Sequence, residues 1–326
     1  MPTPKEKSSN PSPSLSVVVP AYRSPGTLRR LVEGVLENIS ASFSFIEFVF
    51  VDDGSNDGTW ESIEQLAHEF EGVRGLRLSR NFGQHNALLA GIRAATGELI
   101  LTMDDDLQNP PDQIPQLVRA LKSDIDLVYG YPQSETQSAF RNFASRGIKR
   151  LMRMALGDSV NPRHSAFRLF RQRLVDAADH VHDPFVSIDV VLSWATVRQV
   201  AVPVRFDVRS SGISGYTFRR LARHAMNMIT GYGVAPLRAV TWLGLLSAAL
   251  GFVLTAFVLL RFAFSGAPVQ GFTFLAAALS FFSGTQLLGL GIIGEYLGRV
   301  HFRTMGKPNF VVSDRTGYQP PTEQLL

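Results

Sequence analysis

The sequence predicts an α/β domain with a mostly parallel sheet, followed by interfacial helices and a hairpin of two transmembrane helices. Two observations support this prediction. Short apolar segments alternate with helix-length amphipathic segments over residues 16–106, and residues 239–294 carry a single charged side chain, Arg261. Alternating strands and helices favour a parallel sheet with right-handed crossovers, in which ligands bind beyond the carboxyl ends of the strands.

The expected strands are short, and most are nearly continuous apolar runs, which is typical of strands buried on both faces. The segments between them have apolar residues at a spacing near 3.6 and the length of helices. We expect strands at residues 16–20, 45–52, 75–79 and 98–104, and helices at residues 27–39, 59–70 and 81–96.

The composition of the chain argues against nucleic-acid binding and excludes cysteine chemistry. The 326 residues include 32 Lys and Arg against 28 Asp and Glu, which gives a formal charge of only +4. A dedicated nucleic-acid-binding protein is normally far more basic, so we expect no nucleic-acid partner. The chain has no cysteine, which excludes disulfides, thiol catalysis and Cys-ligated zinc.

The uncharged region has the length of two membrane spans. Residues 239–260 and 272–293 are each 22 residues without a charge, about 33 Å of helix against a hydrocarbon core of about 30 Å. Buried helices of a soluble core are the less favoured interpretation, because such helices normally show a polar stripe. Lys and Arg are concentrated before the first span and after the second, which predicts a multi-pass inner (plasma) membrane protein with its large N-terminal domain in the cytosol.

Two basic amphipathic segments lie outside these spans, at residues 139–156 and 216–232. The first fits either a solvated surface helix or a helix that binds anionic headgroups or a phosphate, whereas the second directly precedes the membrane region and favours an interfacial helix. The expected organisation is a disordered tail (1–14), a catalytic domain (15–210), an interfacial region (211–236), a membrane region (237–295) and a cytosolic C-terminal tail (296–326).

Acidic residues follow two of the expected strands. Asp104, Asp105 and Asp106 are adjacent, and their mutual repulsion would be relieved by a bound cation such as Mg²⁺ or Mn²⁺, although they could also cap the following helix. Asp52 and Asp53 could accept hydrogen bonds from a base or a ribose, or could form an Asx turn. Because the chain has neither a G-x-G-x-x-G nor a P-loop motif, the pair of clusters favours a nucleotide held through a metal.

Several motifs together resemble those of the family 2 glycosyltransferases of GT-A fold. Within these, the chain is most similar to membrane-bound polyprenyl-phosphate glycosyltransferases, such as dolichol-phosphate mannose synthases, bactoprenol glucosyltransferases and aminoarabinose transferases of lipid A modification. The resemblance covers residues 16–310 and rests on residues 16–20 (SVVVP), 51–55 (VDDGS), 80–85 (RNFGQH), 102–111 (TMDDDLQNPP) and 294–299 (GEYLGR).

The resemblance implies three groups of site residues. The nucleotide-sugar donor would be surrounded by Pro20, Tyr22, Asp52, Asp53, Asp104 and Asp105. A divalent metal, Mg²⁺ or Mn²⁺, would be held by Asp104, Asp106 and Gln108. The phosphate of the acceptor would meet Arg141, Ser145 and Arg209, so that the catalytic set is Asp104, Asp106, Arg141 and Arg209.

The resemblance implies inverting transfer of a sugar from a nucleotide diphosphate to a polyprenyl phosphate lipid at the cytosolic membrane face. The expected nucleotide is UDP. The sequence leaves open whether the chain forms a homo-oligomer. Gly215 and Gln133 depart from the family, which carries Lys and Arg at these positions. These departures keep open a second interpretation, a catalytically impaired nucleotide-sugar-binding membrane scaffold. A processive polysaccharide synthase is less favoured, because the chain has no Gln-x-x-Arg-Trp motif.

Overall fold

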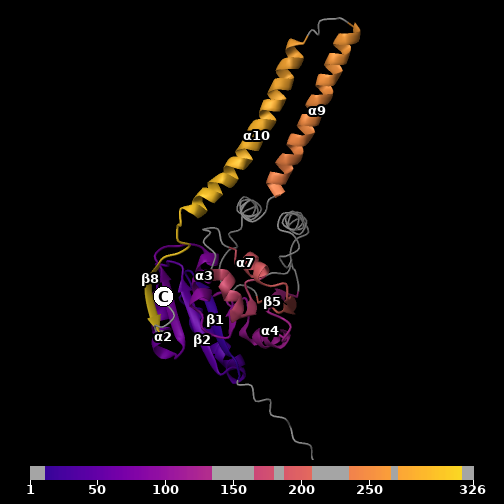
Figure 1. Ribbon diagram of the computed structural model, residues 1–326. Coiled ribbons are helices and arrows are strands. Elements are labelled where there is room, and N and C mark those ends of the chain that lie inside the picture. The colour runs from indigo at the N-terminus through magenta and orange to yellow at the C-terminus, as the bar shows by residue number, and fades with distance from the viewer. Residues whose placement is uncertain (1–11, 134–164, 180–186, 208–234, 266–270, 318–326) are drawn as a thin grey trace, which may run out of the picture. The chain divides into compact units, whose positions relative to one another are not determined.

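The computed structural model describes residues 12–133, 165–179, 187–207, 235–265 and 271–317, which divide into two units (Figure 1). The first unit contains the sheet and the helices that cover it, and the strand at residues 312–317 belongs to it. The second unit contains two long helices.

The sheet of the first unit has eight strands in the described residues, in the order β7-β5-β6-β4-β1-β2-β3-β8. Strands β1, β2, β3 and β4 run parallel to one another, whereas β6 and β8 run antiparallel to their neighbours. The strands are β1 (Ser14–Ala21), β2 (Phe45–Asp52), β3 (Val73–Leu78), β4 (Leu99–Thr102), β5 (Leu127–Pro132), β6 (Arg168–Arg171), β7 (Gln199–Val204) and β8 (Val312–Gly317).

Helices cover both faces of the sheet, which is why its central strands are apolar on both sides. On β1, Leu15, Val17 and Val19 pack into the core beneath α1, α2 and α4, while Val18 packs into the core beneath α3, α6 and α7. The helices are α1 (Leu28–Ile39), α2 (Thr59–Glu69), α3 (Gln84–Ala94), α4 (Ile114–Ala120), α6 (Val175–Asp179) and α7 (Ile188–Ala195), with short 3₁₀ turns at Ser40–Ser42, Pro111–Gln113 and Gln172–Leu174.

The structure confirms the mixed α/β sheet and the strands and helices expected up to residue 106, with boundaries moved by a few residues. The largest change is at α3, which begins at Gln84 instead of residue 81, because residues 81–83 form a loop fastened to the end of β2. The sequence interpretation did not include β5 to β8. Strand β8 lies within residues 296–326, which we expected to be a tail, and pairs with β3.

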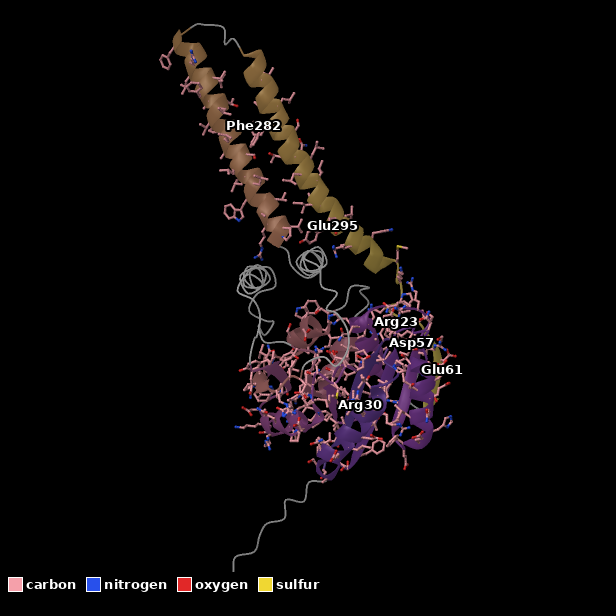
Figure 2. All side chains as sticks on the ribbon, turned by 180° about the vertical axis from the view of Figure 1, so that it is seen from behind. Arg23, Arg30, Asp57, Glu61, Phe282 and Glu295 are labelled. Atoms are coloured by element: carbon pink, nitrogen blue, oxygen red, sulfur yellow. The ribbon has the colours of Figure 1, made fainter. Side chains whose placement is uncertain are left out.

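Within the described residues, the second unit contains α9 (Ala235–Ser265) and α10 (Phe272–Thr304), which pack side by side (Figure 1). Close approach occurs at glycines: a Cβ on Gly251 would lie 3.5 Å from the ring of Phe282, labelled in Figure 2, and one on Gly289 would lie 3.3 Å from Val240. These two contacts show that the helices run antiparallel.

Large apolar side chains of both helices are exposed, including Trp242, Phe252 and Leu287. Within the described residues, one segment is long and apolar enough to cross a membrane, Pro236–Arg261, and none of its most apolar window is buried. It contains the first expected span. The second, residues 272–293, is helical but is not confirmed as a span and stays a prediction.

Candidate functional site

Three turns follow neighbouring strands at one edge of the sheet, the edge formed by the carboxyl ends of β4, β1 and β2. Main-chain hydrogen bonds continue past the strands, from Asp53 N to Ala21 O (2.9 Å) and from Met103 N to Val18 O (3.2 Å). The turns after β2 and β4 therefore lie on either side of the turn after β1. We call this the carboxyl edge.

The turn after β2 is tied to the turn after β1 through Asp52. The buried carboxylate of Asp52 accepts a hydrogen bond from Ser55 N (Oδ1, 2.9 Å), and its Oδ2 lies 3.6 Å from Arg77 Nε. The Ser55 hydroxyl oxygen then accepts a hydrogen bond from Arg23 N (3.1 Å). Figure 2 labels Arg23 and Asp57 on these two turns.

Asp53 fastens the loop before α3 to the end of β2. Its side chain is only 3% exposed, and its two oxygens accept hydrogen bonds from Phe82 N (2.7 Å) and Gly83 N (2.9 Å). Burial raises the pKa of the Asp53 carboxyl, while the two main-chain donors act in the opposite direction. Asp53 therefore has a structural role that the sequence interpretation, which placed it beside the nucleotide, did not include.

The acidic turn after β4 is joined to the turn after β1 and to the first residue of α3. Asp105 Oδ2 accepts a hydrogen bond from Tyr22 N (3.2 Å), and Asp104 Oδ1 accepts one from Gln84 Nε2 (2.6 Å). Asp106 Oδ1 accepts a hydrogen bond from Gln108 N (3.1 Å), two residues on. Burial raises the pKa of the Asp105 carboxyl, against the hydrogen bond from Tyr22, and the neighbouring charge of Asp106 raises it further.

Backbone strain is concentrated at this edge. Among the described residues, the non-glycine positions with positive φ are Arg23 (57°) and Leu107 (58°). Arg23 lies in the turn after β1, and Leu107 lies in the turn after β4. Sparsely populated backbone conformations of this kind are held only where surrounding structure fixes them, and they cluster at ligand-binding sites.

A buried ion pair lies behind the acidic turn. The Thr102 hydroxyl, the last side chain of β4, donates to Ala166 O (2.6 Å) and accepts a hydrogen bond from Arg168 Nε (2.9 Å). Arg168, 1% exposed, is paired with Asp189 at the start of α7. Burial, followed by the charge of Asp189, raises the pKa of the nearby Tyr129 phenol.

The structure brings together most of the predicted donor and metal residues. Tyr22, Asp52, Asp53 and the three aspartates of the acidic turn meet at the carboxyl edge, Pro20 lies on β1 beside Val51, and Gln108 O accepts a hydrogen bond from Asp207 N (2.9 Å). The predicted acceptor residues Arg141, Ser145 and Arg209 lie outside the described residues, as do Gly215 and both basic amphipathic segments. Gln133 is described and exposed, and its N–H donates to Val204 O (3.2 Å).

Sequence reasoning gave no role to Gln84, Ser55 or Arg77. Gln84 and Ser55 lie inside the motifs at residues 80–85 and 51–55, so the motif was the available signal for both. Arg77 lies on β3, where its guanidinium stacks on Trp60 (5.8 Å to the ring centroid) and approaches Asp52, and no sequence spacing indicates that contact.

The donor chemistry of the edge suits a hard divalent ion. Across the described part of the chain, no group of three or more His, Cys, Asp or Glu side chains is arranged to hold a metal by itself. Mg²⁺ sites in nucleotide enzymes do not require such a group, because one or two carboxylates combine with substrate phosphates and water. The half-buried carboxylates of Asp104 and Asp106 fit that type of site.

A mixed α/β sheet with an acidic turn at its carboxyl edge is of the GT-A type. Residues 16–178, half of the chain, match the model of Glycosyl transferase family 2. The chain belongs to this family and is a glycosyltransferase by class.

Solved structures similar to the chain include three further proteins. Mannosyltransferase PcManGT from Pyrobaculum calidifontis, in complex with GDP-Man and Mn²⁺, is 17% identical over 90% of this chain and 88% of its own, with a TM-score of 0.48. Glucosyl-3-phosphoglycerate synthase from Mycobacterium tuberculosis, with Mn²⁺ and UDP-glucose, is 19% identical over 67% and 77% (TM-score 0.44). Mannosyl-3-phosphoglycerate synthase from Rubrobacter xylanophilus is 14% identical over 65% and 70% (TM-score 0.46).

Proposed function

We propose that the protein is an inverting, metal-dependent glycosyltransferase that moves a sugar from a UDP-sugar to a polyprenyl phosphate at the cytosolic face of the plasma membrane. The observation that carries the proposal is the acidic turn after β4, joined by hydrogen bonds to Tyr22 in the turn after β1 and to Gln84, the first residue of α3. The family shows the reaction class, and the motif resemblance supports the proposal of a lipid acceptor.

The donor would bind along the turns after β1 and β2. Tyr22 is 44% exposed at this edge, so its ring is accessible for stacking on a nucleobase. The Asp52 carboxylate is 0% exposed, so it would act on the donor indirectly, by fixing the turn after β2 through Ser55 N. Asp53 fixes the loop before α3 and so contributes to donor binding only indirectly.

Asp104, Asp106 and Gln108 would hold Mg²⁺ or Mn²⁺ against the diphosphate of the donor. When bound, the ion neutralises the charge that develops on the leaving nucleoside diphosphate. The turn that carries these residues is held at both ends, by β4 and by the hydrogen bond from Asp207 N to Gln108 O. A carboxylate pair fixed in this way orients the donor before the acceptor arrives.

The acceptor side of the proposal needs no dedicated general base. A phosphate monoester has a second pKa near about 6, so the lipid phosphate is largely dianionic at neutral pH and is itself the nucleophile. Arg141, Ser145 and Arg209 would hold it by charge-assisted hydrogen bonds. Direct attack on the anomeric carbon, with departure of the nucleotide from the opposite side, inverts its configuration.

The exposed apolar surface of α9 supports a membrane location for the acceptor. Trp242, Phe252 and Leu259 are exposed on this helix, and an apolar surface of this extent is unfavourable in water. Positive residues near its N-terminal end, including Arg238, favour the cytosolic side for that end.

The test is sugar transfer into lipid. Membranes containing the full chain, with Mn²⁺ and polyprenyl phosphate, are incubated with a panel of radiolabelled UDP-sugars, and the organic-extractable label is counted. We expect label in the lipid fraction with one donor, and loss of that label when polyprenyl phosphate or the metal is omitted. UDP binding without lipid label from any UDP-sugar of the panel would instead favour the scaffold suggested by Gln133 and Gly215.

A further inference from the structure

Gln84 joins α3 to the acidic turn by a side-chain hydrogen bond. Its amide Nε2 donates to Asp104 Oδ1 at 2.6 Å, across 20 residues of sequence. Gln84 is the first residue of α3, so its main chain is fixed by the helix while its side chain extends toward the carboxyl edge.

The main chain that carries Gln84 is unusually well fixed. Asp53 accepts hydrogen bonds from both N–H groups immediately before it, those of Phe82 and Gly83. Gly83 has φ +91°, and its carbonyl accepts the N–H groups of Asn86 and Ala87 in the first turn of α3. The end of β2 therefore determines where the helix begins.

Gly54, in the turn after β2, makes a second close contact with the same loop. Gly54 has φ +70°, and a Cβ at this position would lie 2.4 Å from the carbonyl carbon of Arg80 and 2.7 Å from Asn81 N. The main chain after β2 thus packs directly on the main chain of the loop. Two independent contacts therefore hold the loop within the four residues before Gln84.

From these contacts we infer that Gln84 is a positioning residue that sets the Asp104 carboxylate for the divalent ion, an inference that rests on the function proposed above. An N–H donor on one carboxylate oxygen restricts rotation of the group, so less freedom is lost when the ion binds. The amide is uncharged, so it orients Asp104 without neutralising it. A lysine or arginine at position 84 would compete with the cation for the same oxygen.

The test compares two glutamines that make the same kind of contact. Gln84→Met keeps the length of the side chain and removes the donor. Gln65→Met is the matched control, because Gln65 Nε2 donates to Glu69 Oε1 (2.8 Å) on the exposed face of α2. Mn²⁺ binding to the detergent-solubilised full chain, with UDP present, is measured from the EPR signal of free Mn²⁺.

We expect Gln84→Met to weaken Mn²⁺ binding by about 10-fold, with an unchanged melting temperature, while Gln65→Met binds Mn²⁺ as the unsubstituted chain does. In the transfer assay, the Mn²⁺ concentration for half-maximal rate should rise by a similar factor, and kcat at saturating Mn²⁺ should stay within about two-fold. The same Mn²⁺ affinity in both variants would overturn the inference, as would a fall in kcat with unchanged Mn²⁺ affinity.

The proposed function and the role of Gln84 are overturned by different results. If the unsubstituted chain with UDP binds no Mn²⁺, the metal-dependent function and the role of Gln84 are both wrong. If the unsubstituted chain binds Mn²⁺ and transfers sugar while Gln84→Met behaves identically, only the role of Gln84 is wrong.

Discussion

Carboxylates at the two edges of the sheet are held by different chemistry. At the amino edge, Glu47 is 1% exposed and is paired with Arg74 (Nη2 to Oε1, 2.7 Å), and it also accepts hydrogen bonds from Ser16 and from Thr96 N (3.0 Å). Asp126, before β5, is buried among Arg173 and Arg198. Both carboxylates are neutralised inside the fold.

At the carboxyl edge, the three aspartates after β4 are half-buried and each accepts a hydrogen bond from a neutral N–H donor. A neutral donor orients a carboxylate but leaves its charge for a ligand, whereas an arginine neutralises that charge. We therefore expect Glu47 and Asp126 to stabilise the fold, and the three aspartates after β4 to serve binding.

The largest expected effect is at the carboxyl edge. Asp106→Ala should lower the transfer of sugar to lipid on the order of 10³-fold, because it removes a charge aligned with the leaving diphosphate. The melting temperature in detergent should not fall. Asp124→Ala, at an exposed aspartate just before β5, is the control and should leave the rate unchanged. If Asp106→Ala still transfers sugar with metal, the claim that the aspartates after β4 serve binding would be wrong.

The second prediction concerns the amino edge, where a substitution should lower stability and leave sugar transfer unchanged. Glu47→Ala leaves Arg74 buried without its counter-charge and should lower the free energy of unfolding by about 3–5 kcal/mol, measured by denaturant unfolding. Transfer per folded molecule should be unchanged. Asp112→Ala, which breaks the exposed pair with Arg205 (3.0 Å), should cost less than about 1 kcal/mol.

Replacing both Glu47 and Arg74 with apolar residues distinguishes the cost of losing the ion pair from the cost of burying an unpaired charge. The double variant Glu47→Leu, Arg74→Met should recover much of the stability lost in Glu47→Ala, because no unpaired charge remains. If Glu47→Ala has the same free energy of unfolding as the unsubstituted chain but transfers no sugar, the amino edge would have the functional role and the comparison would be wrong.

The sequence was sufficient to predict the carboxyl edge, because parallel strands end together. The apolar runs of β1, β2 and β4 identified three strands, and Asp52 at the end of β2 and Asp104 just after β4 had to lie on one side of the sheet. The parallel arrangement follows from the intervening helices, so this part of the site needed no knowledge of side-chain contacts.

Other parts could not be predicted, for two physical reasons. Strand β8 has three adjacent exposed residues and pairs with β3 from more than 200 positions away, so it carries no apolar pattern. The contact between Gln84 and Asp104, and the use of both Asp53 oxygens by main-chain N–H groups, depend on the path of a loop. Residue type at a strand end predicts a polar site, but loop geometry decides which of the carboxylates contact a ligand.

The third prediction compares two glycines in the turn after β2. Gly54→Ala should destabilise by about 3 kcal/mol, because positive φ and a clash with Arg80 add together. Gly58 also has positive φ (+88°), but a Cβ there would have no other atom within 4 Å, so Gly58→Ala should cost roughly 1 kcal/mol. Only Gly54→Ala should weaken UDP binding by calorimetry, since only it displaces the loop before Gln84. Equal effects of the two substitutions would show that loop contact is unimportant.

The smallest expected effect is the response of Asp126 to acid. Burial opposes ionisation of its carboxyl, but hydrogen bonds from Arg173, Thr196 and Arg198 outweigh burial and lower its pKa below the ordinary value of 3.8. A lowered pKa in the folded state means that ionised Asp126 stabilises the fold above about pH 4 and that this contribution is lost as the pH falls through the folded-state value. Melting temperatures between pH 6 and pH 3 should therefore fall more steeply below about pH 4 in the unsubstituted chain than in Asp126→Asn. Asp124→Asn, at an exposed position, should follow the unsubstituted chain, and parallel curves for all three proteins would show that the arginines at the amino edge do not hold the charge of Asp126.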